Sequence, residues 1–118
     1  MTSLNSTALN QPSSIVLPAL GGIAPTVSGL SAGGFMSGNM FTIYSETFVG
    51  AGIVAGNPWA CQQAYNFEEC KKDVSKVQSK VLQGYALKTA ADGGIDSPIN
   101  MKGKPVWLFS GTVDPLVP

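Results

Sequence analysis

The first half of the chain changes from a strand-like to a helix-like pattern of apolar positions. A short apolar step from Ile23 to Ser28 leads into the glycine-rich segment 29–34, which indicates a strand followed by a sharp turn. Beyond the turn, apolar residues recur at gaps near three and four and predict one buried face of a helix over about Gly34–Glu46. These residues are Phe35, Met36, Met40, Ile43 and Tyr44. The turn therefore joins a strand to a helix.

Two further apolar runs predict buried strands. The run Phe48–Ala55 is nearly continuous, which is typical of a strand covered on both faces in a parallel sheet. The run Pro105–Phe109 predicts a third such strand, with Trp107 in the core. Between them we expect a cysteine-bearing loop (57–73), an amphipathic helix carrying Val74, Val77, Val81, Leu82 and Tyr85, and a loop rich in Gly, Asp and Pro (92–104). This order predicts an α/β fold with a mostly parallel sheet.

The N-terminal residues give a weaker pattern. Residues 1–14 are rich in Ser, Thr and Asn and predict a flexible leader, while Ile15–Leu17 is at best a short strand that ends before Pro18. Residues 1–12 lack the basic and apolar regions of a secretory signal. No apolar run approaches the roughly 20 residues needed to cross a bilayer. We therefore expect no membrane association.

Composition narrows the possible functions. The chain has 118 residues, of which 44% are hydrophobic, and its seven basic and seven acidic residues leave no net charge. This balance excludes the basic surface expected of a protein that binds nucleic acid or an anionic membrane. Neither a phosphate-binding loop nor a metal-ligand cluster occurs, so no cofactor or metal is expected. The chain also contains no histidine, so any imidazole base must come from outside it.

The sharp turn carries a candidate nucleophile. Residues 29–33 read Gly-Leu-Ser-Ala-Gly and fit the pattern G-x-S-x-G, in which a strained turn exposes the serine hydroxyl above the sheet. Gly29 and Gly33 are expected to let neighbouring segments approach closely. Ser31 is then the nucleophile, and the N–H of Ala32, at the start of the helix, is an oxyanion donor. The alternative is a strand-to-helix turn without chemistry.

Asp114 and Trp59 are the other candidate site residues. Asp114 follows the third predicted strand, where an acid would orient a histidine, although an aspartate before Pro115 also suits an ordinary turn. Trp59 follows Asn57 and Pro58 on the loop leaving the second strand. It is expected either to line a substrate cleft near Ser31 or to pack on the surface.

Cys61 and Cys70 are nine positions apart in a polar stretch. This spacing is compatible with a short disulfide loop, which would indicate an oxidising compartment. A zinc site is the other reading, but two thiols supply only half of a coordination shell.

Three blocks of sequence together resemble the extracellular polyhydroxybutyrate depolymerases of the fungal, circularly permuted type, within the α/β-hydrolase superfamily. The blocks are Val27–Met36, Val54–Cys61 with Cys70, and Trp107–Asp114. The resemblance implies that Ser31 is the nucleophile, that Cys61 and Cys70 are bridged, and that Asp114 is the acid of the triad. It also implies that the histidine, the second oxyanion donor and the remaining strands lie beyond Asp114.

The resemblance therefore predicts that residues 15–118 form the N-terminal portion of a single catalytic domain. We expect a truncated chain of a secreted serine esterase that acts on poly(3-hydroxybutyrate) or its oligomers, inactive in these 118 residues alone because the base is missing. Two alternatives stay open: an esterase for cell-wall or lipid esters on the same fold, and an inactive paralogue or binding module. The sequence leaves the oligomeric state undetermined.

Overall fold

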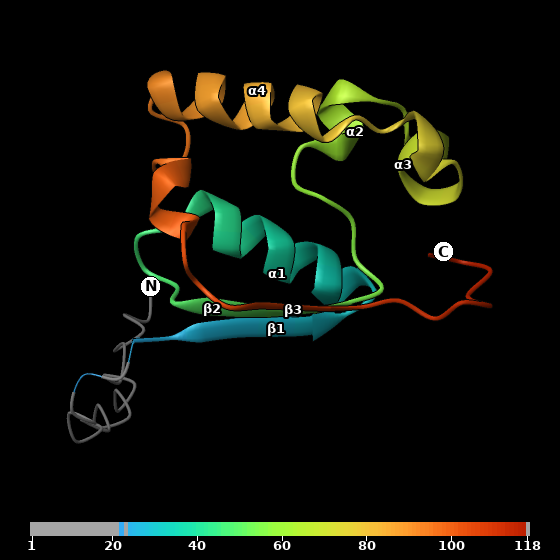
Figure 1. Ribbon diagram of the computed structural model, residues 1–118, viewed down its shortest axis with the longest axis horizontal. Coiled ribbons are helices and arrows are strands. Elements are labelled where there is room, and N and C mark those ends of the chain that lie inside the picture. Colours follow the sequence, from blue (N-terminus) through green and yellow to red (C-terminus); the bar gives the residue numbers. More distant parts are fainter. Residues whose placement is uncertain (1–21, 23, 118) are drawn as a thin grey trace, which may run out of the picture.

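A computed structural model describes residues 22 and 24–117 (Figure 1). Its elements in chain order are β1 (Thr26–Leu30), α1 (Ala32–Ile43), β2 (Gly50–Val54), α2 (Cys61–Ala64), α3 (Phe67–Lys72), the 3-10 helix η1 (Val74–Lys76), α4 (Ser79–Ala91), the 3-10 helix η2 (Pro98–Met101) and β3 (Val106–Phe109). The predicted leader at 1–14 and the predicted strand at 15–17 lie outside the described residues. The prediction of an α/β fold is confirmed.

The three strands form one parallel sheet in the order β1-β2-β3. Thr26 pairs with Gly50 and Leu30 with Val54, while Val54 also pairs with Phe109 on the other side. All three carboxyl ends therefore meet at one edge of the sheet. This edge collects the turn after β1, the loop after β2 and the loop after β3.

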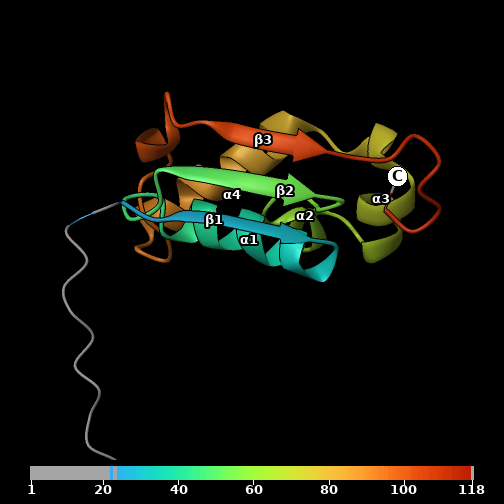
Figure 2. The same cartoon turned by 90° about the horizontal axis from the view of Figure 1, so that it is seen from below.

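In the part of the chain that the structure describes, the helices all lie on one face of the sheet. Figure 1 shows α1 directly against the strands and α4 farther out, and Figure 2 shows the opposite face of the sheet with the helices behind it. The expectation that the apolar strands are covered on both faces is therefore wrong for the described residues. Ala51 of β2 is buried, but all four residues of β3 are exposed, and Trp107 is 60% exposed rather than in the core.

Small residues decide which face of α1 meets the sheet. The buried residues of α1 are Gly34, Ser37, Gly38 and Phe41. Met36, which was expected on the buried face, is 59% exposed, since the face that meets the sheet is the one that carries Gly34 and Ser37. A Cβ atom added at Gly34 would lie 2.5 Å from the carbonyl oxygen of Val54. Ser37 satisfies its buried hydroxyl by donating to the carbonyl of Gly33 at 2.7 Å.

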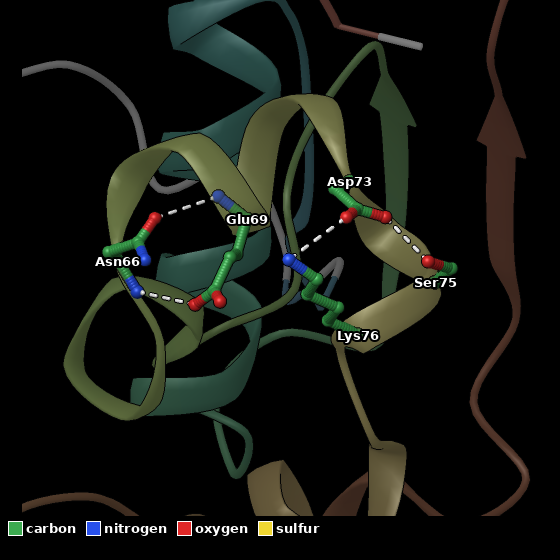
Figure 3. Close-up of polar contacts among 5 residues, drawn as sticks. All are labelled: Asn66, Glu69, Asp73, Ser75 and Lys76. Carbon is green, nitrogen blue, oxygen red and sulfur yellow. Dashed lines mark hydrogen bonds and ion pairs between the residues drawn. The ribbon is translucent and has the colours of Figure 1, made fainter.

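The segment 57–73 was expected as a loop but contains α2 and α3. A capping box begins α3: the Glu69 N–H donates to Asn66 Oδ1 at 2.9 Å, and the Asn66 N–H donates to the Glu69 carboxylate at 3.3 Å (Figure 3). These bonds satisfy amides that a short helix otherwise leaves unpaired. The amphipathic helix expected from Val74 begins only at Ser79, after η1. Among the described helices, none has the length and hydropathy needed to span a membrane.

Candidate active site

Ser31 occupies a strained turn at the carboxyl edge of the sheet. Its backbone has φ 56° and ψ −119°, a conformation that costs a non-glycine residue about 1–3 kcal/mol. Two hydrogen bonds hold the turn: the Ser31 N–H donates to the Val54 carbonyl, and the Phe35 N–H donates to the Ser31 carbonyl, both at 2.9 Å. Ser31 is exposed, and within the described residues its side chain makes no capping bond to α1. Its hydroxyl is therefore available for chemistry.

Two glycines let the turn pack against its surroundings. A Cβ atom at Gly29 would lie 2.2 Å from the carbonyl oxygen of Gly33, and one at Gly34 would lie 2.5 Å from that of Val54. Apart from its chain neighbours and the backbone of its own helix, a Cβ atom at Gly33 would meet no described atom within 4 Å. The expectation that Gly29 allows a close approach is thus confirmed. The second position at which a side chain would clash with backbone is Gly34 rather than Gly33.

Alanine substitutions at Gly29 and Gly33 should therefore have different effects on stability. A Gly29→Ala substitution places a methyl group against rigid backbone, so it should lower the free energy of unfolding by roughly 1–3 kcal/mol. Gly33→Ala adds the same group in open space within a helix, so its effect should be neutral or stabilising by up to about 1 kcal/mol. Thermal unfolding of the purified variants checks both values. Equal destabilisation by the two substitutions would contradict the packing described for the turn.

The amide of Ala32 begins α1 beside Ser31. As one of the first four N–H groups of a helix, it has no acceptor within the helix. The helix dipole adds partial positive charge at the same point. An oxygen that gains negative charge near Ser31 would therefore meet a hydrogen-bond donor already in place.

Asp114 lies in the loop that follows β3 and is held by its own backbone. Its Oδ1 accepts hydrogen bonds from the N–H groups of Leu116 at 2.8 Å and Val117 at 3.0 Å. The bonds from Val117 and Leu116 hold the pKa of the Asp114 carboxyl below its ordinary value of 3.8. Among the described residues, all hydrogen bonds of this carboxylate use Oδ1. The group is therefore ionised near neutral pH and keeps Oδ2 for another partner.

Ser31 and Asp114 follow the two outer strands of the sheet, with β2 between them. Since neighbouring strands lie about 4.8 Å apart, the ends of β1 and β3 are separated by roughly 10 Å. Asp114 lies five residues beyond the end of β3, and the structure records no hydrogen bond between its carboxylate and the Ser31 hydroxyl in the described residues. These 118 residues contain no histidine that could connect the two groups.

Trp59 lines a pocket of about 260 Å³ between α1 and the loop after β2. The α1 side of this pocket is formed by Phe35, Asn39 and Ile43. Ser31 is not among the lining residues, but Phe35 lies one helical turn after it. The amide residues around Trp59 were missed by sequence reasoning, although Asn57 directly precedes Pro58 in one of the recognised blocks.

The structure joins Cys61 and Cys70 by a disulfide with a Cα–Cα distance of 5.8 Å. Both cysteines are buried, at 2% and 0% exposure, and they connect α2 to α3. A loop of this length is stabilised by about 2–3 kcal/mol in the chain-entropy model. In the described ranges, no three His, Cys, Asp or Glu residues gather to hold a metal ion.

Comparisons with known proteins give two relatives with related names. A poly(3-hydroxybutyrate) depolymerase of Delftia acidovorans is 38% identical over 96 residues, which cover 78% of this chain and 19% of the relative. A polyhydroxybutyrate depolymerase of Talaromyces funiculosus is 29% identical over 93 residues, which cover 78% of this chain and 27% of the relative. The chain thus spans about a fifth to a quarter of the length of these two relatives. No family model matches the chain, and no solved structure matches it with significance. The resemblance to the polyhydroxybutyrate depolymerases that the sequence motifs predicted is confirmed over 78% of the chain.

Proposed function

We propose that the whole protein is a serine esterase that hydrolyses the ester bonds of poly(3-hydroxybutyrate) or its oligomers. The observation that carries this proposal is the strained, exposed Ser31 at the junction of β1 and α1. A strained turn at a strand-to-helix junction is the geometry that an esterase nucleophile requires. The names of the two relatives support the substrate.

In the first half of the reaction, the Ser31 oxygen attacks the ester carbonyl carbon and its proton passes to a histidine from outside these residues. The carbonyl oxygen becomes negative in the tetrahedral intermediate, where the Ala32 N–H donates to it. The ester C–O bond then breaks, and the histidine gives its proton to the leaving hydroxyl group. The acyl group remains on Ser31.

In the second half, water attacks the acyl-enzyme with the same histidine as base, and the acid product leaves while Ser31 regains its proton. Asp114 has the properties of the group that orients this histidine. Its Oδ1 is fixed by two backbone N–H groups, so Oδ2 can accept from the imidazole without loss of the turn. Because the pKa of its carboxyl lies below the ordinary value of 3.8, Asp114 stays ionised at the near-neutral pH at which the histidine acts.

We further propose that residues 15–118 form the N-terminal portion of one circularly permuted α/β-hydrolase domain. In the described part of the chain, β1 is an edge strand, although a nucleophile strand of this superfamily usually lies inside the sheet. Permutation accounts for this because the neighbouring strands then come later in the chain. The buried disulfide supports an extracellular location.

Two substrates separate this function from its alternatives. The whole protein should clear a suspension of poly(3-hydroxybutyrate) granules and should also hydrolyse p-nitrophenyl butyrate. Hydrolysis of the soluble ester without loss of granule turbidity would instead indicate an esterase for other esters. Binding to granules without hydrolysis of either substrate would indicate a binding module.

A further inference from the structure

The place of Asp114 depends on β3, whose side chains do little to fix its register. All four residues of β3 are exposed, and in the described part of the chain the strand pairs with β2 alone. The register of a strand is strongly specified where one of its faces is buried, because a slip then changes which side chains are covered. Backbone pairing by itself allows β3 to slide along β2. The register of β3 must therefore be fixed at another point.

Lys104 provides such a point just before β3 begins. Its Nζ donates hydrogen bonds to the carbonyl oxygens of Ser45 and Phe48, the latter at 2.7 Å. Both acceptors lie in the segment that leads from α1 into β2. Hydrogen bonds from a charged donor are stronger than neutral ones. Ser45 is completely buried, so removal of the ammonium group would leave its carbonyl oxygen without this donor and away from water.

Three other hydrogen bonds make the acceptor segment of Lys104 a rigid support. They run from the Asp96 N–H to the Ile43 carbonyl at 3.0 Å, from the Glu46 N–H to Asp96 Oδ2 at 3.0 Å, and from the Ser45 hydroxyl to the Ser97 carbonyl at 3.1 Å. Figure 1 shows the chain passing from α4 beside the end of α1 and then into β3. These three bonds hold residues before η2, whereas Lys104 lies two residues before β3. Lys104 thus transmits this support to the strand.

We propose that Lys104 is a positioning residue for Asp114, which it places by fixing the register of β3 on β2. This role rests on the proposed function, in which Asp114 orients the histidine. A slip of β3 by two residues keeps each side chain on its face of the sheet and moves the following loop by about 6–7 Å. A carboxylate displaced so far loses its hydrogen bond to the histidine. Lys104 therefore acts on the reaction from the opposite edge of the sheet.

The first test measures the register of β3 in the whole protein by cross-linking. Val54 and Phe109 are register partners, and the spacing of about 4.8 Å between neighbouring strands suits a disulfide. Val54→Cys combined with Phe109→Cys should therefore give a disulfide in high yield. Lys104→Met should lower this yield severalfold and should allow Val54→Cys to bond a cysteine placed two positions before or after Phe109, which the native register holds about 8 Å away. Lys102→Met, at an exposed lysine, is the matched control and should leave the yields unchanged.

The second test asks whether Lys104 acts on hydrolysis through Asp114. Lys104→Met should lower kcat for p-nitrophenyl butyrate roughly tenfold to a hundredfold, the loss expected when a catalytic group is misplaced. In an Asp114→Asn background the same substitution should have little further effect on kcat, because the group that it displaces is already lost. Lys104→Arg keeps a cationic donor and should recover most of the rate. A merely structural role would instead reduce kcat by the same factor in both backgrounds.

An unchanged cross-link in Lys104→Met, or equal losses of kcat in the two backgrounds, would overturn the positioning role. If Lys104→Met does not fold, Lys104→Gln, which keeps a donor and loses the charge, replaces it in both measurements. If the wild-type protein hydrolyses no ester but the cross-link depends on Lys104, the proposed function fails while the control of register stands. If the protein hydrolyses esters and the cross-link is independent of Lys104, only the positioning role fails.

Discussion

A Ser31→Ala variant of the whole protein is expected to lose about a millionfold in kcat for ester hydrolysis, as serine hydrolases do when the nucleophile is removed. The methyl group cannot attack a carbonyl, and nothing else at the turn offers an equivalent oxygen. The fold should survive the substitution, since the structure gives the Ser31 hydroxyl no capping role and the turn is held by backbone bonds. Initial rates on p-nitrophenyl butyrate give the loss directly.

Two controls accompany this measurement. The thermal midpoint of Ser31→Ala should equal that of the wild type, which separates lost chemistry from lost structure. Removal of the histidine that we propose as the base should cause a similar loss, because nucleophile and base act as one unit. A variant with Ser31→Ala that retains more than a few per cent of the wild-type rate would contradict the role of Ser31.

Asp114→Asn should lower kcat by about ten-thousandfold, the loss found when a triad aspartate becomes an amide. Asparagine keeps an oxygen that can accept from the Leu116 and Val117 N–H groups, so the turn persists. The charge is lost, and the side-chain amide favours the wrong tautomer of the histidine. Steady-state rates on the same soluble ester measure the effect, while Asp114→Ala removes the turn bonds as well and should also destabilise the fold.

The pH dependence of the wild-type hydrolysis rate provides a second test of the role of Asp114. The backbone bonds lower the pKa of Asp114 below 3.8 in the folded protein, so its stabilising contribution is present above that value and is lost only as pH falls through the lower pKa. The acid limb of the rate profile near neutral pH should therefore report the histidine alone. A limb that persists unchanged in Asp114→Asn, together with a rate near that of the wild type, would show that Asp114 is an ordinary turn residue.

Local patterns were enough to predict the features around Ser31. The Gly-Leu-Ser-Ala-Gly turn depends on residues adjacent in sequence, and Gly29 makes the close contact that the pattern requires. The parallel strands follow from their apolar runs, and the disulfide from the resemblance of the chain to a family. The turn and the disulfide join residues at most nine positions apart, and each strand is indicated by its own short apolar run, although the pairing of the strands joins distant parts of the chain.

Burial could not be predicted in the same way, because it depends on what covers each surface. The apolar run at β3 indicates a core strand, yet Trp107 is exposed in the described part of the chain. On α1, the buried face follows Gly34 and Ser37, since close approach to β2 outweighs the hydrophobicity of Met36. The pocket lined by Asn57 and Trp59 forms between α1 and the loop after β2, and no short sequence pattern predicts such a pocket.

Covalent labelling tests the central claim, that Ser31 is an activated nucleophile, most directly. The folded whole protein is treated with a fluorophosphonate, which reacts with a serine only when a base and an oxyanion site are in place, and the adduct is located by peptide mass spectrometry. We expect one modified peptide, with the adduct on Ser31 and the loss of hydrolysis proportional to labelling. An active, folded protein that carries no adduct at Ser31, or that is inactivated by an adduct at another serine, would contradict it.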